Sequence, residues 1–319
     1  MGEITEKAYG KINLYLDILR KRDDGYHDIY SIMQLVTLCD EVHIETNNGE
    51  GINVTVLNDD LGIPMEKNLA YIAAQKFYDN LENTLVETST RANITITKNI
   101  PVTAGLAGGS ADAAAVLRGL NKIYGWPYTK KELCDLGMEV GSDVPFCIIG
   151  GTHVCKNKGD VEMSLGGLRN FRILIACSGE KESTGKQYQK LDEKFNDFKD
   201  YGISLGFSET IGALMNREYR RSLTSMYNVF ETLYEDDENV QRTKKLLYDN
   251  YARFVMLSGS GPALFAAFDD IFLLEDAQAV LEKEGIKCYP CDLIDEEYEL
   301  YPKRPPLKQY NDYDDEKWI

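Results

Sequence analysis

Residues 101–115 read Pro101-Val102-Thr103-Ala104-Gly105-Leu106-Ala107-Gly108-Gly109-Ser110-Ala111-Asp112-Ala113-Ala114-Ala115. The alternating segment 92–98 before this stretch favours a β-strand, and the Ala- and Leu-rich segment 113–120 favours a helix. Glycines between the two allow positive φ and let a backbone approach an anion closely, because no Cβ intervenes. The free N–H groups and the dipole of a helix N-terminus attract anions at the same point. This order of strand, glycine-rich loop and helix predicts a phosphate-binding loop.

Two common phosphate-binding motifs do not fit this loop. A P-loop needs a Lys after its last glycine, but Ser110 follows Gly109. A dinucleotide-binding fingerprint needs the pattern G-x-G-x-x-G, whereas the glycines here stand at positions 105, 108 and 109. One alternative stays open at this point, in which the loop only leads into a helix that Ser110 caps.

The composition limits the classes of partner. A length of 319 residues suits two domains. With 35 Lys and Arg against 52 Asp and Glu, the net charge is −17, so we expect no nucleic-acid or anionic-membrane partner. No apolar run reaches membrane-spanning length, the first seven residues lack an apolar signal segment, and the 7 Cys are scattered. These features predict a cytoplasmic protein with reduced thiols.

Polar residues that suit catalysis stand on either side of the loop. Lys11 and Asn13 share one face of an expected strand over residues 7–19, and the alternative is a solvated lysine on an exposed face. Thr129 begins a capping box, which predicts a helix before Asp143. Because Pro145 disfavours a continuing helix, Asp143 is expected at a constrained junction before a strand at 148–149. The alternative is an aspartate that only caps its turn.

Two further loops carry candidate binding residues. Tyr26 and His27 follow the Asp24-Gly25 turn, where an aromatic face and a ring nitrogen could meet a planar ligand or simply pack on the turn. Residues 258–262, Ser-Gly-Ser-Gly-Pro, join two expected strands and form either a plain hairpin or a close approach to a ligand.

Taken together, these segments resemble the GHMP kinases (galactose, homoserine, mevalonate and phosphomevalonate kinases). Three family motifs are matched: a strand with Lys11, the glycine-rich stretch 101–111 and the loop 258–262. A narrower resemblance, over residues 7–293, rests on Asp24-Gly25-Tyr26-His27 and on residues 142–146. It points to a member that acts on a cytidine-diphosphate-linked alcohol.

The resemblance implies an α+β fold of two domains. Residues 1–157 would form an N-terminal ribosomal-protein-S5-like domain that holds the phosphate loop and the catalytic residues. Residues 158–293 would form a C-terminal ferredoxin-like α/β domain. The acidic, Tyr-rich residues 294–319 have no recognised counterpart, and we expect a peripheral or poorly ordered tail there.

The resemblance also implies ATP as the phosphate donor and Mg²⁺ as its counter-ion. Adenine would lie near Asn68 and Lys98, and Ser110 could hold the metal. The implied ATP-binding residues are Asn68, Lys98, Pro101, Gly105, Leu106, Ala107, Gly108, Gly109, Ser110 and Ala111.

The implied reaction is phosphorylation of the 2-hydroxyl of a cytidine-diphosphate-linked methylerythritol, in non-mevalonate isoprenoid biosynthesis. Asp143 would accept the hydroxyl proton, and Lys11 would hold Asp143 ionised and stabilise the transferring group. Tyr26 and Tyr188 would sandwich the cytosine while His27 binds its edge. The implied substrate-binding residues are Asn13, Tyr26, His27, Asp143, Tyr188, Gly259 and Ser260.

Two alternatives stay open: a kinase for a mevalonate-like or sugar alcohol, and a catalytically inactive nucleotide-binding regulator. The Asp24–His27 element disfavours the first, since those alcohols carry no base to stack. Retention of Lys11 and Asp143 disfavours the second. We expect a monomer or a weak homodimer.

Overall fold

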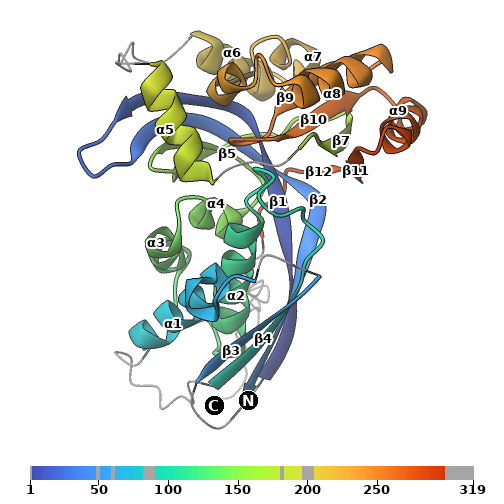
Figure 1. Ribbon diagram of the computed structural model, residues 1–319. Helices are drawn as coiled ribbons and strands as arrows, with labels where there is room; N and C mark the ends of the chain where they lie inside the picture. The colour runs from blue at the N-terminus through green and yellow to red at the C-terminus, as the bar shows by residue number, and fades with distance from the viewer. Residues whose placement is uncertain are drawn as a thin grey trace, which may run out of the picture.

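The computed structural model describes residues 2–47, 51–58, 62–81, 91–179, 183–195 and 205–298, which form two β-sheets with helices packed on them (Figure 1). The strands are β1 (Gly2–Lys21), β2 (His27–Asn47), β3 (Ile52–Leu57), β4 (Arg91–Thr97), β5 (Thr152–Asn157), β6 (Asp160–Ser164), β7 (Arg172–Cys177), β8 (Tyr227–Asn228), β9 (Phe254–Leu257), β10 (Ala263–Phe268), β11 (Lys287–Cys291) and β12 (Leu293–Ile294). The helices are η1 (Met65–Lys67), α1 (Leu69–Leu81), α2 (Gly108–Ile123), α3 (Lys130–Val140), α4 (Val144–Ile149), α5 (Thr184–Lys194), α6 (Leu205–Met215), α7 (Tyr219–Ser222), η2 (Val229–Leu233), α8 (Glu238–Asp249) and α9 (Ile271–Lys283). Among the described helices, none is long and apolar enough to cross a membrane.

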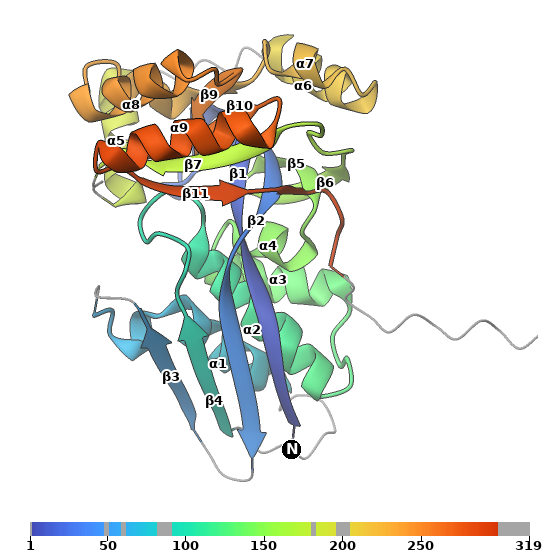
Figure 2. The same cartoon turned by 90° about the vertical axis from the view of Figure 1, so that its right-hand side faces the viewer.

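A long antiparallel ribbon of β1 and β2 runs through both parts of the molecule (Figures 1 and 2). The two strands have 20 and 21 residues, and the Asp24-Gly25 turn joins them as predicted. Register shifts between Tyr9 and Lys11 and between Asn13 and Tyr15 interrupt the ladder. Such irregularities bend a strand, and these two flank Lys11 and Asn13.

The larger sheet has eight strands and carries the glycine-rich loop at one end of β4. Its main order is β3-β4-β2-β1-β8, and β5, β6 and β12 attach to it through β2. Helices α1, α2 and α3 cover one face of its lower part (Figure 1). Because β4 ends at Thr97 and α2 begins at Gly108, the loop between them lies between sheet and helix.

The smaller sheet has the order β11-β7-β10-β9, and each neighbouring pair in it is antiparallel. Helices lie between β7 and β9 along the chain, and α9 lies between β10 and β11. This is the ferredoxin-like arrangement that was expected, and the two-domain α+β class is confirmed.

Several segments of the second half of the chain belong to the larger sheet. The predicted boundary after residue 157 falls at the end of β5, within the β5–β6 hairpin, and residues 160–164 beyond it pair within the larger sheet. Strand β8 pairs with β1, and β12 pairs with β2. The division at 157 therefore stays a prediction for the chain as a whole.

The segment after Asp143 differs from expectation. Residues 144–149 form the short helix α4, where we expected a strand at 148–149. The reason is that Pro145 stands in the first turn, where a missing N–H costs no helical hydrogen bond.

Candidate active site

A cavity of about 760 Å³ lies where the glycine-rich loop, β1, the start of α4, the start of α5 and the loop after β9 meet. Most of the site residues predicted from the sequence line it. They are Lys11, Asn13, Asn68, Lys98, Pro101, Gly105, Leu106, Ala107, Gly108, Gly109, Ser110, Asp143, Tyr188, Gly259 and Ser260. Of the remaining three, Ala111 is buried behind the loop, and Tyr26 and His27 lie outside the cavity lining.

The glycine-rich loop turns sharply into α2. Gly105 has φ +86°, and Ala107 stands at the N-cap in the left-handed region with φ 58°. Helix α2 therefore begins at Gly108, earlier than the predicted helix at 113, and its N-cap makes no side-chain hydrogen bond. The alternative in which Ser110 caps the helix is wrong. The first-turn N–H groups are left to bind an anion in the cavity, with the helix dipole adding to the attraction.

The loop after β9 packs directly on the glycine-rich loop. The Ser258 hydroxyl donates to the Gly105 carbonyl at 3.2 Å. A Cβ on Gly105 would lie 2.1 Å from the Ser258 carbonyl oxygen, and one on Gly259 would lie 2.6 Å from the Gly105 carbonyl oxygen. Asn228, which the sequence did not single out, donates to the Gly259 carbonyl at 2.8 Å. The loop is thus more than a plain hairpin, because two glycines let it interlock with the phosphate loop.

Lys11, Asn13 and Asp143 meet at the floor of the cavity. The buried Lys11 ammonium donates to Asn13 Oδ1 at 2.6 Å and lies 3.8 Å from a carboxylate oxygen of Asp143. The Asn13 amide donates to the Ser31 hydroxyl at 2.9 Å. Asp143 occupies the N-cap of α4, yet its side chain makes no capping hydrogen bond. The alternative of an aspartate that only caps its turn is therefore not supported, and the arrangement pairs a proton acceptor with a cation.

Lys98 reaches the cavity but is held by two carboxylates. Its ammonium donates to Asp40 at 2.5 Å and to Asp112 at 2.7 Å. Asp40 is fully buried and also accepts the Ile100 amide at 2.8 Å. Burial raises the pKa of the Asp112 carboxyl, and the nearby Lys98 opposes that shift. This network fixes the chain between β4 and the glycine-rich loop.

The residues expected to bind a pyrimidine are only partly brought together. The His27 ring stacks on Tyr188, with the ring centroids 4.7 Å apart, and its Nε2 is hydrogen-bonded to Asp192 Oδ1 at 2.8 Å. Tyr26 is 51% exposed and lies against Lys158, whose ammonium is 3.6 Å from the ring centroid. Tyr188 lines the cavity, and Tyr26 does not.

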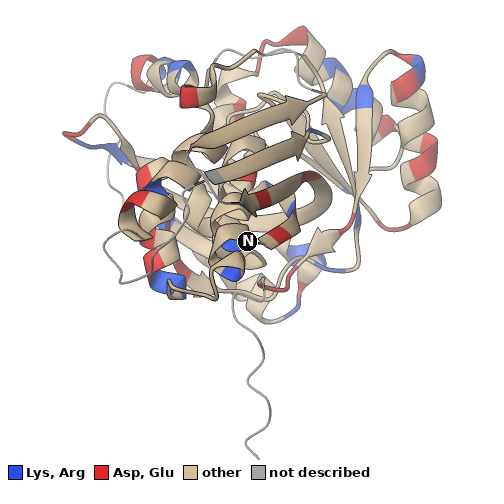
Figure 3. Ribbon diagram, turned by 90° about the horizontal axis from the view of Figure 1, so that it is seen from below, with Lys and Arg blue, Asp and Glu red and all other residues tan. Residues whose placement is uncertain are grey.

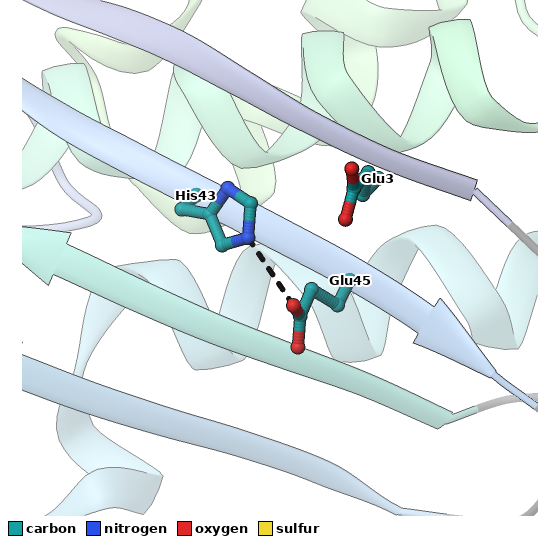
Figure 4. Close-up of side chains that lie close together, drawn as sticks. All are labelled: Glu3, His43 and Glu45. Atoms are coloured by element: carbon teal, nitrogen blue, oxygen red, sulfur yellow. Dashed lines mark hydrogen bonds and ion pairs between the residues drawn. The ribbon is translucent and has the colours of Figure 1, made fainter.

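Oxygen ligands that suit Mg²⁺ line the cavity, namely the Ser110 hydroxyl and the carboxylates of Asp112 and Asp143. Asp112 Oδ1 is buried and has no hydrogen-bond partner within the described part of the chain, so this oxygen is available to bind a proton or a cation. Away from the cavity, three side chains of types that can bind a metal, Glu3, His43 and Glu45, lie close together and point outward from β1 and β2 (Figure 4).

The surface charges are mixed rather than gathered by sign. In the view of Figure 3, acidic and basic residues are interspersed along the outer helices and loops. An anionic ligand would therefore be attracted by the groups inside the cavity, the loop amides and Lys11, rather than by a basic face in this view.

Comparisons with known proteins agree with this geometry. A family model described as the GHMP kinases N terminal domain matches residues 68–151. The 4-diphosphocytidyl-2-C-methyl-D-erythritol kinase of Caldicellulosiruptor saccharolyticus is 40% identical over 291 residues, which cover 90% of this chain and 96% of that protein. The kinase of the same description from Alkaliphilus metalliredigens is 36% identical, with 84% and 89% covered.

Solved structures share the fold. A crystal structure of 4-(cytidine 5'-diphospho)-2C-methyl-D-erythritol kinase superposes with a TM-score of 0.72 at 24% identity, covering 91% of this chain and 99% of that one. The homoserine kinase of Cytophaga hutchinsonii gives 0.70 at 18% identity, covering 93% and 96%. At these identities the structural likeness supports the fold alone.

Proposed function

The chain belongs to the family of 4-diphosphocytidyl-2-C-methyl-D-erythritol kinases, and on that premise we propose how its cavity transfers the γ-phosphoryl group of ATP to the 2-hydroxyl of that substrate. The observation that carries the proposal is the Lys11–Asp143 pair, 3.8 Å apart and facing the same cavity as the phosphate loop. The reaction is a step of the non-mevalonate route to isoprenoid precursors.

In this mechanism, the first-turn N–H groups of α2 hold the phosphates of ATP. Asp143 accepts the proton of the attacking hydroxyl, and Lys11 stabilises both the carboxylate and the charge that develops on the transferring group. Asn13, which accepts from Lys11, orients the methylerythritol. Phosphoryl transfer needs little more than such positioning and charge neutralisation.

We propose that Mg²⁺ accompanies ATP and that Ser110 holds it, with Asp112 as a nearby oxygen ligand. When bound, the metal would neutralise charge on the β- and γ-phosphates. The oxygen atoms described above are of the kind that this ion prefers.

Adenine would lie near Asn68 and Lys98, which line the cavity together with Tyr188. For the substrate base, Tyr188 supplies the aromatic face that His27 does not cover, the stacked His27 supplies the edge contact, and Tyr26 covers the other side of the base. Since Tyr26 now lies against Lys158, this sandwich needs Tyr26 to turn toward the cavity.

We further propose a cytoplasmic enzyme that acts as a monomer or weak homodimer, with small molecules rather than nucleic acid or membranes as its partners. The net charge of −17 supports the choice of partners, because a strongly acidic protein repels nucleic acids and anionic membranes. Sedimentation of the purified protein would decide the oligomeric state.

The test of the mechanism is a double-mutant cycle. Asp143→Asn and Lys11→Ala should each lower kcat by about 10²–10⁴-fold, the usual effect of positioned acid–base catalysis. The double variant should be little worse than either single one, because groups that act together are not additive.

Asp135→Asn on α3 is the matched control, since Asp135 is exposed and its ion pair within the described part of the chain is with Lys131 of the same helix. A parent-like kcat in Asp143→Asn, at saturating ATP and substrate, would remove Asp143 from the mechanism. Mevalonate and homoserine, run in the same coupled ADP-release assay, should give no turnover.

A further inference from the structure

The chain does not end at the smaller sheet, because residues 293–298 return to the larger one. We call this segment the strap. Leu293 and Ile294 pair with Val36 and Leu35 of β2. Residues 294–298 are thus ordered and attached to the larger sheet, although they remain half-buried or exposed, and the expected tail beyond them, residues 299–319, lies outside the described part of the chain.

The strap closes the C-terminal end of α4. The Tyr298 amide donates to the Ile149 carbonyl at 2.8 Å, and Glu297 forms a β-bridge with Gly150. Glu297 also pairs with Lys130 of α3 at 2.8 Å and with His153 of β5 at 3.2 Å. The last carbonyls of a helix have no hydrogen-bond donors within that helix. The strap therefore supplies a donor, the Tyr298 amide, to the last carbonyl of α4.

Tyr298 also covers a buried arginine. Its ring centroid lies 3.6 Å from the Arg118 guanidinium carbon, and Arg118 is only 1% exposed. Arg118 donates to the Cys147 carbonyl of α4 at 2.6 Å and to the Lys7 carbonyl of β1 at 2.9 Å. Tyr298 also stacks on Tyr9 of β1, with ring centroids 6.0 Å apart. Tyr298 and Arg118 therefore join α4 to β1.

These two elements carry the catalytic pair. Asp143 directly precedes α4, and its carbonyl accepts the Cys147 amide at 3.1 Å. Lys11 stands two residues beyond Tyr9 on β1. Since α4 has six residues, its far end lies only about 9 Å from Asp143. A shift of α4 against β1 would therefore change the separation of Lys11 and Asp143.

We propose that the strap is a positioning element for catalysis, in which Tyr298, packed on Arg118 of α2, fixes α4 against β1 and thereby holds Asp143 at its working distance from Lys11. The inference rests on the proposed role of Asp143 as proton acceptor. Neither Tyr298 nor Arg118 lines the cavity, so both act through other residues.

The test uses the full-length chain with Tyr298→Ala. A misplacement of about 1 Å in a reacting group can cost about 10²-fold in rate, so we expect kcat to fall by about 10- to 10²-fold. The KM for ATP should stay near the parent value, because none of the hydrogen bonds, ion pairs and ring contacts described for the strap reaches residues 101–110. Hydrogen exchange should become faster at the amides of residues 147–150.

Three variants give this test its controls. Tyr298→Phe keeps the stacked ring and loses the hydrogen bond from the Tyr298 hydroxyl to the Lys7 carbonyl, which is 3.3 Å long and exposed, so it should restore most of kcat and of the protection from exchange. Phe272→Ala removes an aromatic side chain that is 72% exposed on α9 and should change neither. If Tyr298→Ala does not fold, Tyr298→Leu keeps apolar volume without an aromatic face, and its kcat should fall below that of Tyr298→Phe.

Parent-like kcat and parent-like exchange in folded Tyr298→Ala, or in folded Tyr298→Leu, would overturn the inference. Lower stability alone, with kcat per folded molecule unchanged, would also overturn it. Asp143→Asn is measured in parallel. If that variant keeps the parent kcat, the proposed role of Asp143 as proton acceptor is wrong. In that case the exchange rates of residues 147–150 still decide whether the strap holds α4.

Discussion

Replacing Gly105 by alanine should force apart two loops that now interlock. Gly105 has φ +86°, a conformation that a residue with a Cβ rarely adopts. The new Cβ would lie 2.1 Å from the Ser258 carbonyl oxygen and 3.2 Å from the Gly261 amide nitrogen. The first distance is about 1.3 Å short of the 3.4 Å at which ordinary contacts begin. Both neighbours are backbone atoms, so no flexible side chain can move aside.

The expected loss of stability follows from two contributions. A left-handed conformation costs a residue with a Cβ roughly 1–2 kcal/mol, and overpacking costs roughly 1–3 kcal/mol more. Together they predict a loss of about 2–5 kcal/mol, a large part of the about 5–15 kcal/mol that keeps most proteins folded. Separation of the loops should also lower kcat/KM by about 10²-fold or more, since both loops line the cavity.

Urea denaturation gives the change in the free energy of unfolding, and calorimetric titration with ATP gives the nucleotide affinity. Gly109→Ala is the matched control, because its Cβ would meet only Leu69 Cδ1, at 3.6 Å. That variant should keep or gain stability, by up to about 1 kcal/mol, since alanine is the better helix former. If Gly105→Ala unfolds at the parent's urea concentration and binds ATP as the parent does, the loops do not depend on their close contact.

Three further predictions concern the base site and two buried titratable groups. Tyr26→Ala should weaken binding of the cytidyl substrate by about 1–3 kcal/mol, which would be measured as a higher KM for that substrate with unchanged ATP affinity. An unchanged KM would place Tyr26 outside the substrate site. Burial raises the pKa of Asp112, so its stabilising contribution is present at low pH and is lost as pH rises through the raised value. The unfolding free energy of Asp112→Asn relative to the parent should therefore increase from about pH 4, near the ordinary carboxyl pKa, to about pH 7, the raised pKa of Asp112, and no change in urea denaturation over this range would contradict this. Burial lowers the pKa of His153, so stability falls as pH drops below the ordinary histidine range, and His153→Gln should flatten that fall in thermal melts.

Local signals in the sequence predicted the local structure well. The capping box at Thr129 is present, with both of its hydrogen bonds. Asn68 caps α1 through the amide of Ala70 at 2.9 Å. The Asp24-Gly25 turn forms as predicted, because such signals depend on a few neighbouring residues and need no tertiary context. The same reasoning predicted the order of strand, glycine-rich loop and helix that the structure has from β4 to α2.

Contacts between distant positions could not be predicted in this way. Lys98 and Asp40 are 58 positions apart, and His27 and Asp192 are 165 positions apart. Spacing along one element says nothing about which elements meet, so the network beneath the phosphate loop and the partner of His27 had no signal in a single sequence. The attachment of residues 294–298 had no signal for the same reason: an acidic composition did not show that Tyr298 would cover Arg118.

The ribbon of β1 and β2 determines how the molecule unfolds. Strand β1 contributes Leu16 and Ile18 to one apolar core and Ile12 and Leu14 to the other. Two domains joined by a linker could each unfold at its own temperature. Because β1 contributes to both apolar cores, its loss would disrupt both cores together. Heating or denaturant should therefore give one cooperative transition, with equal calorimetric and van't Hoff enthalpies, although the chain has two sheets. The parts that bind ATP and the alcohol are then lost and regained together.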